Sequence, residues 1–389
     1  MRKRGKIILM KNFEIKTKIK FGEDSLSFLN TIKNKKIFIV TDPFMMKSGM
    51  IKKVTDKLKD VEYKIFSDVV PDPPMELIVS GVEGVTDYKP DVIIALGGGS
   101  SIDAAKAIMH FSRQIGNLSE MEFIAIPTTS GTGSEVTSFA VISNAQKGIK
   151  YPLVSDELLP DIAILEPELV KSVPKAIVAD TGMDVLTHAV EAYVSTKAND
   201  FSDALAEKAV KLTFEYLKKS YDNQNDIEAK EKMHNASCIA GLAFNITSLG
   251  INHAIAHNIG GRLHIPHGRI NAVLLPHVIE FNAAIEGFNP KTYTTAATRY
   301  AHLAKLVGIQ GSNTRMLVKG FITEIVKLEK SMDMPTSIRE CKVTQEQYEK
   351  ALNDIAAGAL EDACILTNPR TASHNSVLGI LEKINRPFA

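Results

Sequence analysis

The sequence predicts a two-part fold, in which an N-terminal α/β domain with a parallel sheet precedes an all-helical C-terminal domain. Short apolar runs rich in β-branched residues alternate with amphipathic stretches early in the chain, whereas later stretches carry helical apolar spacing and few β-type runs. The pattern changes between residues 165 and 180, where Pro167 and Pro174 interrupt it. We therefore place the domain boundary at residue 178, giving domains 1–178 and 179–389.

The first domain alternates strands and helices in chain order. Strands are expected over residues 36–42, 63–66, 91–96 and 123–126. A basic amphipathic stretch at 47–59 and helices at 75–88 and 102–110 lie between them. This rhythm is typical of a parallel sheet with helices on its faces.

The second domain is expected to consist of long helices. Asp180-Thr-Gly182 is interpreted as the start of the first one. Helical apolar spacing then covers residues 182–193, 203–221, 229–245, 251–263 and 293–307.

Composition indicates an ordinary globular protein and argues against several classes. Hydrophobic residues make up 44% and charged residues 23% of the 389, and a formal net charge of +1 gives no general attraction to nucleic acid. Three cysteines without CxxC spacing argue against a disulfide framework and favour a reduced, cytoplasmic setting. The apolar run after the basic start is too short for a signal peptide, and no run has the length to span a membrane.

Two glycine-rich segments each follow a predicted strand. Residues 97–106 (GGGSSIDAAK) lead from a strand into a helix, where free backbone N–H groups and the helix dipole suit a phosphate. Three consecutive glycines do not match G-x-G-x-x-G, and a tight turn alone would also use them. Residues 126–135 (IPTTSGTGSE) form the second segment, and a helix start capped by Thr132 or Ser134 is its alternative interpretation. Together the two segments predict a nucleotide site.

Asp42 ends the predicted strand at 36–42. A carboxylate at this position can accept hydrogen bonds from ribose hydroxyls and would repel a 2′-phosphate, which favours NAD over NADP. An ordinary turn residue at the end of a strand is the alternative.

Histidines are concentrated in one segment of the second domain. Six of the ten fall between residues 234 and 277. His253 and His257 are four residues apart on one helix face, His267 follows shortly after, and Asp184 and His188 repeat the same spacing earlier. Imidazoles with a carboxylate suit a divalent metal, either iron or zinc. Ala254 follows His253, so the segment is not the H-E-x-x-H motif of metalloproteases.

Taken together, these motifs resemble those of the iron-containing (group III) alcohol dehydrogenases over essentially the whole chain. The matching stretches are residues 97–106, 127–135, 182–193 (GMDVLTHAVEAY), 253–257 (HAIAH) and 266–268 (PHG). The resemblance implies a Rossmann-like dinucleotide-binding domain and an all-α metal-binding domain, with the active site between them.

The resemblance also implies roles for individual residues. Metal ligands for Fe²⁺, or Zn²⁺, are expected at Asp184, His188, His253 and His267, and His257 is expected to handle a proton beside the metal. Contacts with NAD(H) are expected at Asp42, Gly98, Gly99, Ser100, Thr128, Thr129 and Lys150.

The sequences of residues 184–204 and 266–276 resemble those of the short-chain propanol and ethanol dehydrogenases of bacterial microcompartments. This likeness implies a primary alcohol/aldehyde pair such as 1-propanol/propanal or ethanol/acetaldehyde. A homodimer in the cytoplasm or inside a microcompartment is expected, with neither nucleic acid nor membrane as a partner. Arg269 stands where many relatives have an apolar residue.

Two alternative functions are consistent with the same two-domain plan. One is a glycerol (polyol) dehydrogenase or a dehydroquinate synthase-like NAD enzyme. The other is a nucleotide- and metal-binding protein without turnover. An intact ligand set argues against the second, because a retired active site has no chemical need for it.

Overall fold

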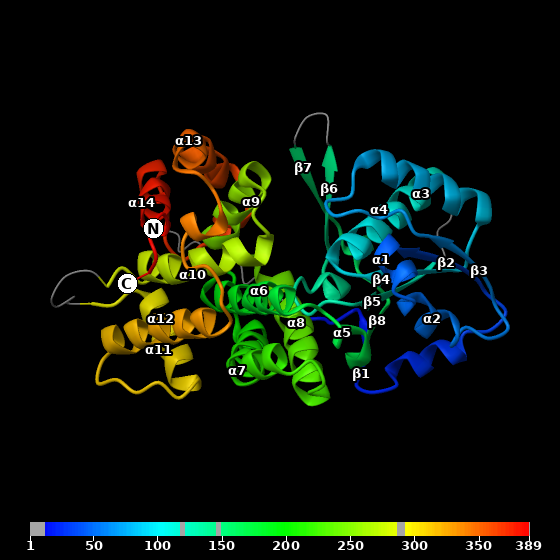
Figure 1. Cartoon of the computed structure of the whole chain (residues 1–389), viewed down its shortest axis with the longest axis horizontal. Helices are drawn as coiled ribbons and strands as arrows, with labels where there is room; N and C mark the ends of the chain where they lie inside the picture. The colour runs from blue at the N-terminus through cyan, green and yellow to red at the C-terminus, as the bar shows by residue number, and fades with distance from the viewer. Residues whose placement is uncertain (1–11, 117–120, 145–148, 286–291, 389) are drawn as a thin grey trace, which may run out of the picture.

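The computed structural model describes residues 12–116, 121–144, 149–285 and 292–388. The basic N-terminal residues considered above therefore lie outside the described part of the chain. A sheet with its covering helices lies on one side and a larger group of helices on the other (Figure 1). This arrangement confirms the predicted fold class.

The first part is built on a six-stranded parallel sheet with the strand order β1-β8-β5-β4-β2-β3. Its strands are β1 (Lys18–Phe21), β2 (Lys36–Thr41), β3 (Glu62–Phe66), β4 (Val92–Gly97), β5 (Glu122–Pro127) and β8 (Ile162–Leu165). The four predicted strands are β2 to β5, and they lie next to one another in the sheet. The edge strand β1 and its neighbour β8 were not predicted.

Both faces of this sheet are buried because successive side chains point to opposite sides. Along β2, Phe38 and Val40 join the apolar core that includes α3 (Met75–Tyr88) and α4 (Gly99–Gly116). Ile37 and Ile39 join a second core with residues of α2 (Met50–Thr55). The central strands are accordingly apolar on both faces, as the sequence indicates.

Several shorter elements surround the sheet. They are η1 (Ser25–Thr31), α1 (Pro43–Lys47), the antiparallel pair β6 (Phe139–Asn144) and β7 (Ile149–Val154), η2 (Ser134–Val136), η3 (Asp156–Leu158) and α5 (Pro167–Val170). The basic stretch at 47–59 is not one continuous helix. Gly49, at φ +76°, separates α1 from α2, and α2 ends at Thr55. Helix α3 has the predicted bounds, whereas α4 extends beyond them at both ends.

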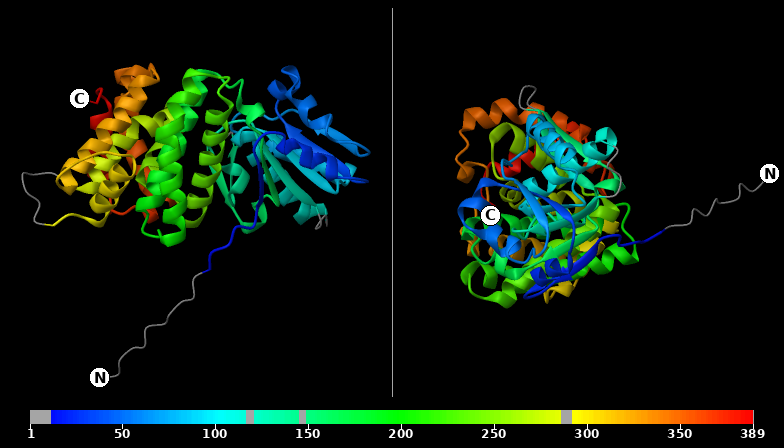
Figure 2. Two further views of the ribbon diagram at one scale, coloured as in Figure 1. Left: turned by 90° about the horizontal axis from the view of Figure 1, so that it is seen from below. Right: turned by 90° about the vertical axis from the view of Figure 1, so that its right-hand side faces the viewer.

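Among its described residues, the second part contains helices joined by loops and no strand. Its elements are α6 (Lys175–Val194), α7 (Asp200–Asp222), α8 (Ile227–Thr247), α9 (Ile251–Leu263), α10 (His267–Ala283), α11 (Thr295–Leu306), α12 (Thr314–Ser331), η4 (Arg339–Cys341), α13 (Gln345–Glu361), η5 (Ala363–Thr367) and α14 (His374–Ile384). A view from below also shows this part beside the sheet (Figure 2, left).

The predicted start of α6 at residues 180–182 is wrong. The helix begins at Lys175, directly after Pro174. Asp180 lies inside it and accepts hydrogen bonds from Arg269 Nε at 3.1 Å and Nη2 at 2.9 Å. Its carboxylate therefore forms an ion pair and does not cap the helix. Local sequence spacing does not reveal this ion pair, because Arg269 is far away in the chain.

Among the described residues, no single helix combines the length and apolar character needed to cross a bilayer. Helices α8 and α9 meet that test only as a pair, and they are bent by 107° relative to each other.

A buried lysine and a buried aspartate fasten α4 to the segment after β5. Lys106 Nζ donates to the backbone oxygens of Thr137 and Phe139, both at 2.7 Å. Asp103 accepts from Ser134 Oγ at 2.6 Å and from the Val141 N–H at 3.1 Å. Burial lowers the pKa of Lys106 to about 8, so the side chain remains mostly charged at pH 7. These bonds fix the second glycine-rich segment against the first.

We expect Lys106→Met to lower the free energy of unfolding by about 2–4 kcal/mol, because buried carbonyls and Asp103 would lose their cationic partner. Urea unfolding followed by circular dichroism measures the change. Lys208→Met, at an exposed position on α7, is the matched control and should change stability by less than about 0.5 kcal/mol. Equal stability of the two variants would contradict a bracing role for Lys106.

Candidate metal and cofactor site

The first glycine-rich segment lies at the carboxyl edge of the sheet, between β2 and β4. Chain order reverses direction there, because β3 lies on one side of β2 and β4 on the other. Ligands of open α/β sheets bind at such switch points. Gly97 has φ +150°, and an added Cβ would lie 2.3 Å from Ser101 Oγ. Only glycine lets the backbone turn this tightly into α4.

The two glycine-rich segments lie against each other. A Cβ on Gly98 would be 3.5 Å from Thr129 Oγ1, and one on Gly99 would be 2.8 Å from Thr132 Cγ2. The Thr128 N–H also donates to the Gly97 carbonyl at 2.9 Å. Backbone donors and hydroxyls are thereby gathered beside the N-terminus of an 18-residue helix, an arrangement suited to a pyrophosphate. Neither Thr132 nor Ser134 caps a long helix, since only the short η2 follows.

Asp42 is held at the same edge. Its Oδ1 accepts from the N–H groups of Phe44 at 2.8 Å and Met45 at 3.1 Å, which makes it the N-cap of α1. Its Oδ2 accepts from Ser101 Oγ at 3.3 Å. The structure thus brings together Asp42, Gly98, Gly99, Ser100, Thr128 and Thr129. The backbone of Lys150 lies on β7 opposite Ser143, and its side chain falls outside the described residues.

A second group of residues gathers in the helical part. Asp184, His188, His253 and His267 each offer one ligand-type atom, and these atoms lie within 4.8 Å of one another. They come from α6, α9 and α10. Asp184 Oδ1 is 3.7 Å from Nε2 of both His253 and His267. Burial alone would raise the pKa of Asp184, but the neighbouring imidazoles outweigh it and hold that pKa well below its usual range.

His188 is buried and packs between two rings. Its ring centroid is 4.5 Å from that of Phe244 and 4.6 Å from that of His253. Burial lowers the pKa of His188 to about 4, so its imidazole is neutral near pH 7. Its Nδ1 is buried without a hydrogen-bond partner among the described residues. A carboxylate and imidazoles that converge in this way fit a divalent cation.

Asn271, which the sequence analysis did not single out, completes this cluster. Its Nδ2 lies 2.7 Å from Asp184 Oδ1 and 3.1 Å from Nε2 of both His253 and His267. Asn252 sets this orientation, because its Nδ2 donates to Asn271 Oδ1 at 2.9 Å. An uncharged amide thus lies in the middle of the ligand-type atoms and donates to Asp184. The signal in the sequence is the spacing of Asn271, one helical turn after His267.

Glu191 was also missed, and it supports His253 from behind. Its Oε2 lies 2.5 Å from His253 Nδ1, and its Oε1 accepts from the Asn252 N–H at 2.8 Å. An ionised carboxylate only accepts, so Nδ1 carries the proton and Nε2 is left to bind a metal. Glu191 and Asp184 raise the pKa of His253 to about 9 despite its burial, so Nε2 also carries a proton at pH 7, which a bound metal would displace. Glu191 lies two turns after Asp184 on α6, which is the sequence signal for it.

His257 lies beside these four residues but is not one of them. Its ring stacks on that of His267 with centroids 5.4 Å apart and planes 12° apart. Its Nδ1 is 2.9 Å from Asp362 Oδ2. The spacing of His253 and His257 alone did not show which of them belongs to the group of four. In the structure, His253 belongs to it and His257 lies beside it.

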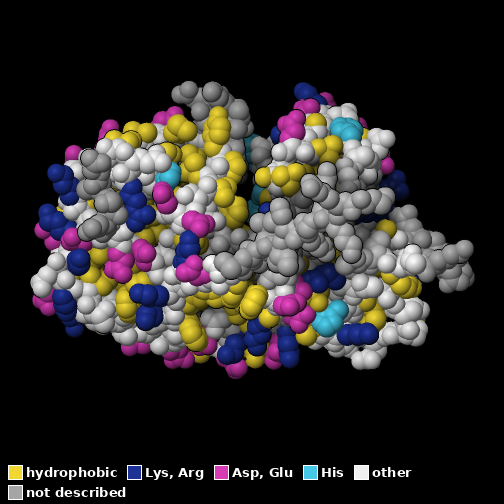
Figure 3. All heavy atoms as spheres, turned by 180° about the vertical axis from the view of Figure 1, so that it is seen from behind, with side chains coloured by type: hydrophobic (Ala, Val, Ile, Leu, Met, Phe, Trp, Pro, Cys, Tyr) yellow, Lys and Arg dark blue, Asp and Glu magenta, His cyan; other side chains and the backbone are white. Residues whose placement is uncertain are grey.

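The segment after β5 joins the two regions. A Cβ on Gly131 would lie 2.7 Å from Thr181 Cβ on α6, and Ser130 Oγ is 3.0 Å from His234 Nδ1 on α8. The molecule is hollowed between the sheet and the helices, and histidine side chains are visible inside this hollow (Figure 3). The second glycine-rich segment therefore contacts α6, the helix that carries Asp184 and His188, and also α8.

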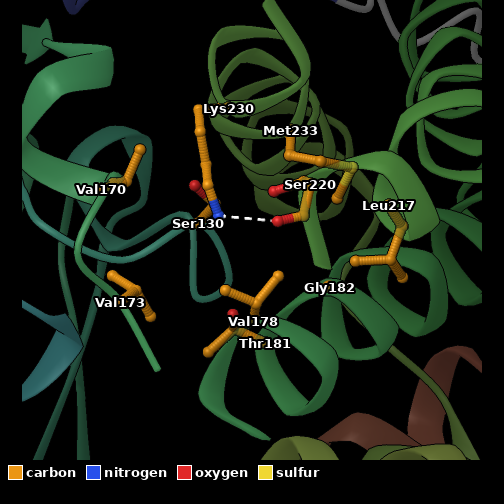
Figure 4. A pocket seen from close by; sticks show the side chains of 10 residues that line it. All are labelled: Ser130, Val170, Val173, Val178, Thr181, Gly182, Leu217, Ser220, Lys230 and Met233. Atoms are coloured by element: carbon orange, nitrogen blue, oxygen red, sulfur yellow. Dashed lines mark hydrogen bonds between the residues drawn. The ribbon is translucent and has the colours of Figure 1, made fainter. Parts of the chain in front are cut away.

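A separate cavity beneath this segment is too small for substrate. Ser130, Thr181, Ser220 and Lys230 are among its lining residues, and it encloses about 10 Å³, room for about one water molecule (Figure 4). Lys230 Nζ donates to the Ser220 carbonyl at 2.8 Å across it.

Sequence families match both parts of the chain. A family described as iron-containing alcohol dehydrogenase matches residues 16–167. A family described as the C-terminal part of Fe-containing alcohol dehydrogenases matches residues 178–385.

Individual relatives cover nearly the whole chain. The 1-propanol dehydrogenase PduQ of Citrobacter freundii is 47% identical over 379 residues, which are 96% of this chain and 100% of that protein. The crystal structure of a 1,3-propanediol oxidoreductase has 32% identity and a TM-score of 0.88, covering 97% of this chain and 100% of its own. A sulfoacetaldehyde reductase from Bifidobacterium kashiwanohense, solved in complex with NAD⁺, has 27% identity and a TM-score of 0.84, covering 97% and 99%.

Gly268 tests the geometry of the cluster. A Cβ there would lie 2.1 Å from the Asp180 carbonyl oxygen, so Gly268→Ala must push α10 away from α6 and move His267 relative to Asp184. We expect metal affinity to fall about tenfold or more, as for lost support around a metal site. Metal analysis after dialysis against a competing chelator measures this loss. Gly379→Ala on α14, where an added Cβ meets nothing within 4 Å, should retain metal, and equal retention by both variants would contradict the proposed constraint.

Proposed function

The chain belongs to the iron-containing alcohol dehydrogenase family, and from this membership we propose that it transfers a hydride between NAD(H) and a short-chain primary alcohol/aldehyde pair. We propose 1-propanol/propanal or ethanol/acetaldehyde as the pair. The 1-propanol dehydrogenase relative supports this substrate class.

One observation carries the proposal. Ligand-type atoms of Asp184, His188, His253 and His267 lie within 4.8 Å of one another, and the second glycine-rich segment packs against α6, which carries two of these residues. We propose that these four residues hold Fe²⁺, with Zn²⁺ as an alternative because imidazole suits both metals. Glycerol dehydrogenase and dehydroquinate synthase-like activities remain alternatives, and the PduQ relative disfavours them.

When bound, the divalent ion supplies Lewis acidity at the substrate oxygen and the nicotinamide carries the hydride. The protein contributes charge and orientation. Asp184 would provide the anionic ligand. Glu191 holds Nδ1 of His253, so that Nε2 of the same ring points toward Asp184 and the proposed metal position. His257, exposed beside the cluster, is the proposed residue that takes up or supplies the hydroxyl proton.

The cofactor residues are proposed to bind rather than react. Backbone N–H groups at Gly98, Gly99 and Ser100, with the hydroxyls of Thr128 and Thr129, would hold the pyrophosphate at the start of α4. Asp42 would accept hydrogen bonds from the ribose hydroxyls and disfavour a 2′-phosphate. Lys150 is a further proposed contact of the dinucleotide. The NAD⁺ complex of the sulfoacetaldehyde reductase supports a dinucleotide site in this fold.

We further propose that residues 1–178 and 179–389 are separate domains, and that the enzyme is a homodimer. Its proposed location is the cytoplasm or the interior of a bacterial microcompartment. The change from alternating strand and helix patterns to helical spacing supports the domain boundary. The likeness to propanol dehydrogenases supports the dimer and the location. Size-exclusion chromatography with light scattering tests the dimer directly.

NADH oxidation with propanal tests the function. Protein purified without oxygen is assayed before and after chelation, and then with Fe(II) or Zn(II) added. The proposal expects turnover that falls on chelation and returns with one metal. Turnover with glycerol but not with propanal would favour a polyol dehydrogenase. Binding of metal and NADH without turnover on any short aldehyde would support a lyase or a non-catalytic protein instead.

Two histidine variants separate metal binding from proton transfer. His267→Ala is expected to lose metal and activity together, because it removes a ligand. His257→Ala should keep its metal and lose mainly kcat, by about 10²-fold as for removal of a general acid–base. Metal analysis and steady-state kinetics on both proteins provide the comparison. A metal-free His257→Ala protein would contradict this division of roles.

Cofactor choice is expected to depend on the charge of Asp42. Asp42→Asn retains a side-chain cap for α1 and removes the negative charge, so it should raise kcat/KM with NADPH relative to NADH by about tenfold. Asp24→Asn, which changes an exposed aspartate in the same part of the chain, is the control. An unchanged preference for NADH in Asp42→Asn would exclude Asp42 from cofactor selection.

A further inference from the structure

The contact between His257 and Asp362 joins two segments that are far apart in the sequence. His257 lies on α9 one turn after His253, and Asp362 lies between α13 and η5. His257 Nδ1 and Asp362 Oδ2 are 2.9 Å apart, although 105 residues separate them in the chain. The exposed fraction is 39% for the His257 side chain but only 19% for that of Asp362. The carboxylate is therefore the more enclosed partner.

Asp362 is itself held in place. Its Oδ1 accepts from the Cys364 N–H at 2.8 Å, and its own N–H donates to the Gly358 carbonyl at 3.1 Å. Helix α13 packs tightly on α9, because a Cβ on Gly358 would lie 2.0 Å from Asn258 Oδ1. One carboxylate oxygen is thus fixed by backbone, and the other faces His257. The carboxylate is therefore held by bonds other than its contact with His257.

This arrangement selects one form of the imidazole. An ionised carboxylate only accepts hydrogen bonds, so Nδ1 of a neutral His257 carries the proton and Nε2 carries the lone pair. Among the described residues, no protein group bonds Nε2. The ring also stacks on His267, so this nitrogen remains beside the ligand cluster.

We infer that Asp362 is a positioning residue for proton transfer, which it serves by holding His257 as the Nδ1–H tautomer with Nε2 free for the substrate hydroxyl. This inference rests on the proposed function of His257. In alcohol oxidation, the O–H bond breaks and its proton binds Nε2. The resulting imidazolium is stabilised by the Asp362 carboxylate. In aldehyde reduction, the N–H bond breaks and the proton returns to the product oxygen.

A metal site is the competing explanation for the same residues. Ligand-type atoms of His257, Asp362 and Cys364 also lie within 4.8 Å of one another. Under that explanation the holoenzyme would bind a second metal equivalent through the Cys364 thiol. The positioning role needs no second metal, so metal stoichiometry distinguishes the two.

Asp362→Asn in the metal-loaded enzyme is the decisive variant. Its carbonyl can still accept from Cys364, but its amide would donate to Nδ1 and stabilise the wrong tautomer. We expect kcat with propanal to fall about tenfold or more, while KM, NADH affinity and metal content stay unchanged. The solvent deuterium isotope effect on kcat should rise, because proton transfer becomes slower than hydride transfer. Asp354→Asn, at an exposed position on α13, should behave as wild type.

The double variant with His257→Ala distinguishes failure of this inference from failure of the proposed function. If Asp362 acts through His257, Asp362→Asn causes no further loss in a His257→Ala background. A further loss of the same size there would overturn the inference, as would wild-type kcat in the single Asp362→Asn variant. A second metal equivalent that disappears with Cys364→Ser would also overturn it. Wild-type kcat in His257→Ala alone would instead refute the proposed role of His257, and this inference with it.

Discussion

The convergence of one buried carboxylate with three imidazoles is the constraint on which the helical part depends. Asp184 is nearly inaccessible to solvent, and a buried charge is costly unless it is paired. The imidazoles that surround it come from other turns and other helices, so α6, α9 and α10 must meet at one point. Gly268 allows the close approach of α10 to α6, and Glu191 fixes one ring from the opposite side. A divalent cation bound at this point, as proposed, would satisfy acceptor atoms that the Asn271 amide only partly satisfies.

The segment after β5 lies where the sheet and the helices pack together, and it contributes to both proposed sites. The segment after β5 contributes Thr128 and Thr129 to the proposed cofactor site. A few residues later, Gly131 and Gly133 pack against α6 and α8. Lys106 braces the continuation of the same segment from α4. A displacement of this segment would therefore change the cofactor site and the metal cluster together.

Local patterns in the sequence predicted the elements and most candidate residues, but not the contacts between distant elements. The continuous apolar runs of β2 and β4 and the helical spacing of the histidines are properties of neighbouring residues, so the sequence alone reveals them. The bond from Glu191 to His253, the amide of Asn271 and the bond from Asp362 to His257 each depend on how separate helices pack. The predicted start of α6 was wrong for the same reason, because Asp180 forms an ion pair with Arg269 on α10 and does not cap the helix. The edge strand β1 is only four residues long, which leaves little periodic signal.

Anomalous diffraction at the iron K-edge tests the central claim most directly. Crystals would be grown without oxygen from protein loaded with Fe(II), and data collected on both sides of the edge. The account predicts one strong peak per chain, bonded to Asp184, His188, His253 and His267, with His257 beside it and not bonded. A peak held instead by His257, Asp362 and Cys364, or no peak within bonding distance of Asp184, would contradict the account.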